Sequence, residues 1–185
     1  MIPNLNPSGV LPLGRHPATA QEIQDRFVSD PSFTGSATRQ EIWLHWLQAV
    51  EDLRQVVPVC AVWLAGSFFT DRLDPDDMDG LYIVPSREAF EAKAMNPEAA
   101  AVLGAFATNR VRDLTGLRLD TFVLEWMRSP VPGVHRFLNG TYFETRGHWD
   151  DFWQRVRHGA KGTVFDADCL PERGYLEVTI DGWSV

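Results

Sequence analysis

The chain has 185 residues, of which 44% are hydrophobic, 11% aromatic and 23% charged. These proportions are typical of an ordinary soluble globular protein and exclude a disordered, collagen-like or membrane-spanning chain. Seventeen basic residues against twenty-five acidic ones leave a net charge of -8, so bulk nucleic-acid binding is not expected. The length predicts a single domain over residues 1–185.

Residues 1–17 combine prolines and two glycines without hydrophobic periodicity, which predicts an extended N-terminal arm that lies on the domain. This segment lacks the basic start and unbroken apolar stretch of a secretory signal. The longest apolar run, Val56 to Phe69, falls short of the roughly 18 to 20 apolar residues that span a bilayer. Cys60 and Cys169 are too few for a disulfide framework or a cysteine-rich zinc site. We therefore expect a cytoplasmic protein that binds no membrane.

Two helices are predicted after this arm. Thr19 and Glu22 have the spacing of a capping box and begin a short helix. Thr38 and Glu41 repeat the pattern at the start of a longer helix, whose apolar residues recur at helical spacing through about Val56.

The rest of the chain alternates predicted strands with predicted helices. Short runs rich in β-branched and aromatic residues predict strands over residues 58–65, 79–84 and 117–124. Helices are predicted after Ser86, after Pro97 and around residues 149–156. Two further strand candidates, residues 162–165 and 175–180, flank a turn and predict a hairpin. The fold class is therefore α/β of the α+β kind, a small mixed sheet layered with helices.

The most informative stretch begins where the first predicted strand ends. This strand delivers Gly66 and Ser67 into a tight turn. Because Gly66 has no Cβ, the backbone there can approach a bulky anion while neighbouring N–H groups point at it. A short helix after Ser67 would add a favourable partial positive charge. The turn is therefore predicted to bind phosphate.

Acidic residues follow this turn. Nine residues separate Ser67 from Asp77, and Asp79 comes two positions later. Side chains at i and i+2 of an extended chain share a face about 6 to 7 Å apart, so these carboxylates can bracket a pair of Mg²⁺ ions. Asp120, within an otherwise apolar strand, is the best candidate for a third ligand, since a carboxylate in a sheet is costly without a cationic partner. The alternative for Asp120 is a structural carboxylate that caps a local backbone group or pairs with Arg118.

At these residues the sequence resembles the nucleotidyltransferase superfamily of DNA polymerase β-like fold. The superfamily pattern is an apolar residue, Gly-Ser or Gly-Gly, a gap of roughly nine to thirteen residues, then Asp-apolar-Asp/Glu. The chain matches it with residues 65–67 and 77–79. The resemblance covers about sixty residues, from Val62 to Leu124, and extends to a little-characterised group of small stand-alone bacterial and phage proteins. Gly80 departs from the pattern, which usually has an apolar residue there.

The resemblance implies roles for these residues. Gly66 and Ser67 would hold the triphosphate of an NTP, and Asp77 and Asp79 would bind Mg²⁺. Asp120 would complete the metal site and help to deprotonate the acceptor.

Further residues are candidates for phosphate contacts or for metal binding. Arg72, in the gap, and Lys161 are further candidates for phosphate contacts. Glu125 and Asp113 are the substitutes for Asp120 as a metal ligand.

The function that this implies is Mg²⁺-dependent transfer of a nucleotidyl group from an NTP to an unidentified hydroxyl acceptor, with release of pyrophosphate. The acidic net charge favours a small molecule or a protein over tRNA as the acceptor. The alternative is a catalytically degenerate domain of the same fold that serves as a binding protein, antitoxin-like or a phage accessory module. Small stand-alone members of the superfamily can form homodimers, but no exposed apolar stripe in this sequence identifies a dimer interface.

Overall fold

The computed structural model describes residues 1–128, 140–160 and 162–183. The helices are α1 (Ala20–Phe27), α2 (Arg39–Arg54), α3 (Ser86–Met95), α4 (Pro97–Ala107), α5 (Val111–Thr115) and α7 (Gly140–Trp153). The strands are β1 (Gly14–Ala18), β2 (Ala61–Ala65), β3 (Met78–Pro85), β4 (Leu119–Trp126) and β5 (Gly174–Thr179). Short 3₁₀ turns occur at η1 (Pro31–Phe33), η2 (Ser67–Phe69) and η3 (Asp166–Cys169).

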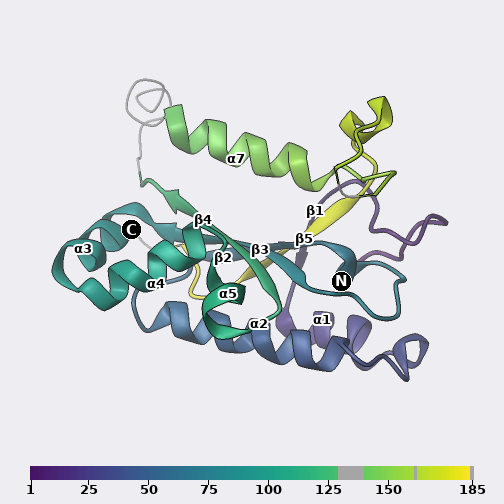
Figure 1. Cartoon of the computed structure of the whole chain (residues 1–185), viewed down its shortest axis with the longest axis horizontal. Helices are drawn as coiled ribbons and strands as arrows, with labels where there is room; N and C mark the ends of the chain where they lie inside the picture. Colours follow the sequence, from purple (N-terminus) through teal and green to yellow (C-terminus); the bar gives the residue numbers. More distant parts are fainter. Residues whose placement is uncertain (129–139, 161, 184–185) are drawn as a thin grey trace.

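The five strands form one mixed sheet in the order β1-β5-β2-β3-β4. The outer pairs, β1 with β5 and β3 with β4, are parallel. The central strand β2 is antiparallel to both of its neighbours, β3 and β5. The prediction of a mixed α+β sheet with helical layers is therefore confirmed (Figure 1).

Side chains alternate between the two faces of the sheet along each strand. Apolar side chains therefore lie on both faces, and helices cover both. On one face Val62, Leu64 and Tyr82 join a core with Trp43 and Trp46 of α2, all of them buried. The opposite face has its own buried cluster, in which side chains of β2, β3 and β5 pack under α7. Figure 1 shows α2 and α7 on opposite sides of the sheet. Each fully buried large side chain contributes roughly 1.5 to 3 kcal/mol of stability.

The N-terminal segment is more ordered than predicted. It lies on the domain as expected, with Ile2 and Leu11 buried, but its last residues form strand β1. This strand pairs in parallel with β5, from Gly14 opposite Gly174 to Ala18 opposite Val178. The arm therefore adds an edge strand to the sheet, which a local reading of its prolines misses.

The predicted C-terminal hairpin is wrong. Residues 162–165 form no strand, and Val164 and Phe165 are exposed. Strand β5 instead lies between β1 and β2, where it finds partners from distant parts of the chain. The predicted helix around residues 149–156 is also displaced, since α7 runs from Gly140 to Trp153.

Within the described ranges, no helix is both long enough and apolar enough to cross a bilayer.

Candidate functional site

Three aspartates lie at the edge of the sheet where β3 and β4 begin. Asp79 and Asp120 are opposite each other in the parallel pair β3–β4, so their side chains leave the same face. Asp77 comes immediately before β3 and two residues before Asp79. This is the face that Leu81 and Ile83 bury under α7. The sheet therefore brings Asp120 to the same place as Asp77 and Asp79, although Asp120 lies 41 residues after Asp79 in the sequence.

The glycine turn reaches the same place. Ala65, the last residue of β2, is opposite Asp79 in the antiparallel register, and Gly66 follows it. Gly66 has φ 95° and ψ -174°, a conformation that is essentially restricted to glycine. A Cβ built on Gly66 would also collide with Oδ2 of Asp79. Gly66 therefore allows the turn and the carboxylate to touch, and the half-buried Ser67 begins the 3₁₀ turn beside it.

Burial and the neighbouring carboxylates both disfavour the charged forms of Asp77 and Asp79. Burial, together with the charges of Asp77 and Asp120, raises the pKa of Asp79 to about 7. Burial, Asp120 and Asp76 likewise raise the pKa of Asp77. Within the described residues, the side chains of Asp79 and Asp120 make no hydrogen bond or ion pair. Carboxylates in this state are stabilised by a cation.

The three carboxylates have the ligand atoms that Mg²⁺ needs, but they are not arranged around a common point. Carboxylate oxygens are the ligands that Mg²⁺ prefers. In the described part of the chain, however, no three His, Cys, Asp or Glu side chains are already gathered so that they could hold a metal ion. Oδ2 of Asp77 accepts a hydrogen bond from Nη1 of Arg112 at 2.9 Å instead. Asp77 would have to exchange Arg112 for an ion.

A buried arginine that the sequence reading missed holds the loop between Gly66 and Asp77. Arg39, at the start of α2, is 1% exposed and lies with its guanidinium 3.7 Å from the centre of the Phe33 ring. Burial lowers its pKa to about 10, against the opposing charges of Asp74 and Asp71. The guanidinium donates to five backbone carbonyls, those of Phe27, Phe68, Thr70, Arg72 and Leu73. The loop is therefore fixed from its interior side.

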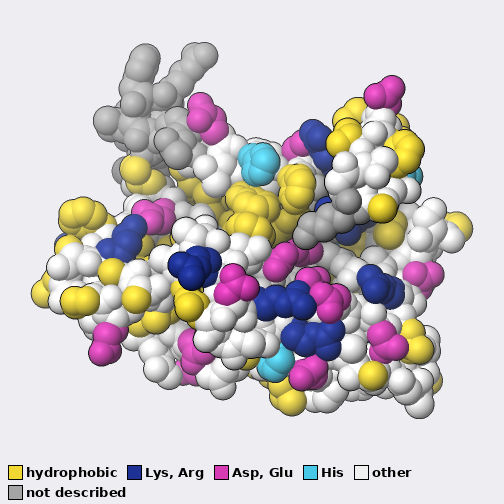
Figure 2. Space-filling model, in the orientation of Figure 1, with side chains coloured by type: hydrophobic (Ala, Val, Ile, Leu, Met, Phe, Trp, Pro, Cys, Tyr) yellow, Lys and Arg dark blue, Asp and Glu magenta, His cyan; other side chains and the backbone are white. Residues whose placement is uncertain are grey.

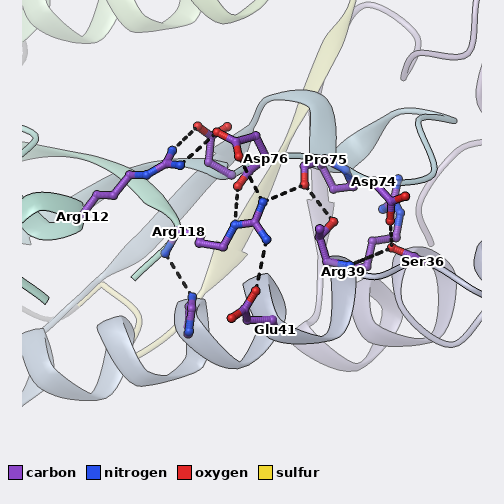
Figure 3. A network of polar contacts seen from close by, with 11 residues as sticks. Ser36, Arg39, Glu41, Asp74, Pro75, Asp76, Arg112 and Arg118 are labelled. Atoms are coloured by element: carbon purple, nitrogen blue, oxygen red, sulfur yellow. Dashed lines mark hydrogen bonds and ion pairs between the residues drawn. The ribbon is translucent and has the colours of Figure 1, made fainter. Parts of the chain in front are cut away.

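Two more arginines hold the acidic end of this loop (Figure 3). Arg118 donates to the backbone carbonyl and the carboxylate of Asp76 and pairs with Glu41. Arg112 bridges Asp76 and Asp77. The ion pair of Asp120 with Arg118, the alternative raised above, is therefore absent from the described contacts, because Arg118 is engaged with the loop.

The same network explains why the capping box predicted at Thr38 and Glu41 does not form. Thr38 is the N-cap of α2, but its side chain makes no cap hydrogen bond. Its hydroxyl donates instead to the carbonyl of Pro75, and Glu41 pairs with Arg118. The capping box is present at Thr19 and Glu22, where no loop competes for the side chains.

The other candidate residues lie outside the cluster of carboxylates or outside the described residues. Arg72 is exposed, and its side chain makes no hydrogen bond or ion pair with any described residue. Lys161 lies outside the described residues. Glu125 pairs with Lys93 at 2.6 Å, and Asp113 is exposed on α5.

Gly80, the departure from the superfamily pattern, does not interrupt β3. A Cβ at this position would come within 3.0 Å of the Tyr82 ring, which lies over it. Glycine here therefore makes room for a buried tyrosine on the face opposite the carboxylates.

Two further arginines act on the cluster from its other side. The charges of Arg173 and Arg157 lower the pKa of Asp79, in opposition to the carboxylates. Figure 2 shows acidic and basic side chains gathered side by side in the middle of the face that it presents. Neither arginine lies in the motif, and their position depends on where β5 joins the sheet, so no local pattern could have identified them.

Comparison with known proteins places this chain in a family without assigning it a function. A family described as a family of unknown function, DUF6932, matches residues 3–179, and the chain belongs to it. No curated protein and no solved structure matches the chain.

Proposed function

We propose that this member of a family of unknown function is a Mg²⁺-dependent nucleotidyltransferase, which moves an NMP group from an NTP to a hydroxyl acceptor. The observation that carries the proposal is the contact between Gly66 and Asp79 at the edge of the sheet, with Asp120 opposite Asp79 and Asp77 two residues away. A site for a metal-bound polyphosphate needs two parts. One is a glycine turn that admits the anion, and the other is a set of carboxylates that attracts the cation.

Each residue has a task in this reaction. Asp77, Asp79 and Asp120 would hold Mg²⁺, which neutralises charge on the triphosphate when bound. Gly66 lets the backbone approach the phosphates, and Ser67 lies at the start of the same turn. The acceptor oxygen forms a bond to the α-phosphorus, the bond from that phosphorus to the bridging oxygen breaks, and pyrophosphate leaves. Asp120 accepts the proton of the acceptor hydroxyl.

In this proposal, the arginine network of the loop holds the glycine turn and Asp77 in place relative to each other. The buried Arg39 fixes the carbonyls between Phe68 and Leu73, so the distance from the glycine turn to Asp77 does not depend on a mobile loop. Fixed placement of reacting groups supplies much of the rate enhancement in phosphoryl transfer. The net charge of -8 favours a small molecule or a protein as the acceptor.

Calorimetric titration with each NTP, with Mg²⁺ and with EDTA, tests the proposal. The parent is expected to bind at least one NTP only when Mg²⁺ is present, and Asp77→Ala/Asp79→Ala is expected to lose that binding. Asp113→Ala, which removes an exposed acid of α5, is the matched control and should bind as the parent does. A parent that binds no NTP in a metal-dependent manner contradicts the proposal.

The second candidate function is a binding protein of the same fold without catalysis. It is favoured by the ion pair of Asp77 with Arg112 and by the lack of a ready-made metal group among the described residues. Under this alternative, protein partners captured by the parent are also captured by Asp77→Ala/Asp79→Ala. Loss of those partners in the double variant argues against it.

A further inference from the structure

A small cavity lies between the end of α7 and the start of β5. Its volume is about 190 Å³, and its lining consists of Phe152, Val156, Arg155, Arg157, Asp168 and Arg173. Pockets that enclose drug-sized ligands occupy roughly 300 to 1,000 Å³. The cavity therefore suits a small anion better than a nucleoside.

Two of the charged residues in this lining already have partners. Asp168 accepts hydrogen bonds from the backbone N–H of His158 and from its ring, and these bonds lower its pKa. Arg155 pairs with Asp151, although its Nε is buried and has no hydrogen-bond partner in the described part of the chain. The negative charge in the lining is thus largely satisfied, and one buried N–H donor remains available.

The other two arginines have no carboxylate partner among the described residues. Nε of Arg173 donates to the carbonyl of Trp153 at 3.1 Å, which leaves its terminal nitrogens without a described partner. Arg157 makes no ion pair within the described ranges. Burial lowers the pKa of Arg173; the charge of Asp79 opposes this shift, and the charge of Arg157 adds to it. Two guanidinium groups that repel each other beside a cavity are stabilised when an anion binds between them.

The fold places these arginines next to the carboxylates. Arg173 directly precedes β5, and the antiparallel register that pairs Leu64 with Leu176 brings the start of β5 to the end of β2, where Gly66 follows. Asp79 touches Gly66 and feels the charges of both arginines. Asp79 therefore lies between carboxylates on one side and guanidinium groups on the other.

We propose that Arg157 and Arg173 form an anion site that takes the diphosphate end of a polyphosphate, next to Asp79. This inference deepens the proposed function, because it assigns part of the phosphate binding to the segment before β5 rather than to the Gly66–Ser67 turn alone. The two guanidinium groups donate to the terminal phosphate oxygens, and the cluster of carboxylates lies on the side of the α-phosphate. The nucleoside lies outside the cavity.

Inorganic pyrophosphate, titrated in the presence of EDTA, is the probe that separates this site from metal binding. The parent is expected to bind pyrophosphate more tightly than inorganic phosphate. Arg157→Gln, at an exposed position, and Arg173→Gln are each expected to weaken pyrophosphate binding by about tenfold or more. Asp79→Asn is expected to bind pyrophosphate more tightly than the parent, because it removes a neighbouring negative charge.

Arg87→Gln is the matched control, since Arg87 is exposed on α3 and pairs with Glu91 away from the cavity. It should bind pyrophosphate as the parent does, and circular dichroism should show that each variant is folded. If Arg173→Gln fails to fold, Arg157→Gln and Arg157→Lys still decide the matter. Failure of pyrophosphate to bind the parent, or unchanged binding in Arg157→Gln, overturns the inference. Pyrophosphate binding that depends on both arginines, in a protein without metal-dependent NTP binding, upholds this site and refutes the nucleotidyltransferase.

Discussion

Arginines on the two sides of Asp79 differ in how they are used. On the side of the loop, Arg39 donates to five carbonyls, and Arg112 and Arg118 pair with the acids of that loop. On the side of β5, Arg157 and Arg173 have no carboxylate partner among the described residues. Arginines with satisfied donors hold structure in place, whereas arginines with free donors beside a cavity remain available to a ligand. The comparison therefore assigns to the first group the ordering of the loop and, in our proposal, assigns ligand binding to the second.

The largest effect on stability is expected from Arg39→Met. The substitution removes the donor to several carbonyls of the loop, and each charged hydrogen bond of this kind contributes roughly 1.5 to 3 kcal/mol. The free energy of unfolding in urea should fall by about 4 kcal/mol or more. Arg87→Met, on an exposed ion pair, should change it by less than about 0.5 kcal/mol. Equal losses in the two variants would contradict the difference drawn between paired arginines of the loop and of the surface.

Asp79→Asn comes next and has a defined pH dependence. The pKa of Asp79 rises from 3.8 to about 7 on folding, so between these values the folded protein binds more protons than the unfolded one. Stability of the parent therefore falls as the pH rises through this window. The variant should be more stable than the parent by about 2 to 4 kcal/mol at pH 8, and the difference should disappear below about pH 4.

Urea unfolding of both proteins at several pH values measures this difference. Asp113→Asn, which changes an exposed acid, should show no such profile. A parent that gains stability relative to Asp79→Asn between pH 4 and pH 7 would contradict the electrostatics described for the cluster.

Gly66→Ala is expected to have a smaller effect on stability and a large one on nucleotide binding. The backbone conformation of Gly66 costs a residue with a side chain roughly 1 to 3 kcal/mol, and the new methyl group would displace the carboxylate of Asp79. Gly104→Ala is the matched control, because Gly104 lies within α4 with open space around it. That control should stabilise the protein by about 0.5 to 1 kcal/mol. Unchanged Mg²⁺-dependent NTP binding in Gly66→Ala would count against the glycine turn.

The smallest effect on stability is expected from Arg112→Gln. Its ion pairs are partly exposed, and such pairs contribute roughly 0 to 1 kcal/mol. The substitution frees Asp77, so Mg²⁺ should bind more tightly than to the parent. Isothermal titration with Mg²⁺ measures the change, and weaker binding in the variant would show that Arg112 supports the metal ligands instead of competing with them.

The sequence predicts what depends on local patterns. The turn at Gly66, the pair Asp77–Asp79 and the strands on either side of it are adjacent along the chain, so spacing alone places them. Strand β1 and the position of β5 could not be predicted, because both depend on pairing between segments more than 100 residues apart. Arg39 follows a helix cap, where an arginine is normally exposed, and only the folded loop explains its burial. The charges of Arg157 and Arg173 act on Asp79, and Arg173 is close enough because β5 lies beside β2.

Binding of Mn²⁺ in place of Mg²⁺, followed by electron paramagnetic resonance without nucleotide, tests most directly whether the cluster of carboxylates attracts divalent cations. The parent should bind Mn²⁺, Asp79→Asn and Asp120→Asn should each lose most of that binding, and Asp113→Asn should keep it. Equal binding of Mn²⁺ by all four proteins, or none by the parent, would contradict the account.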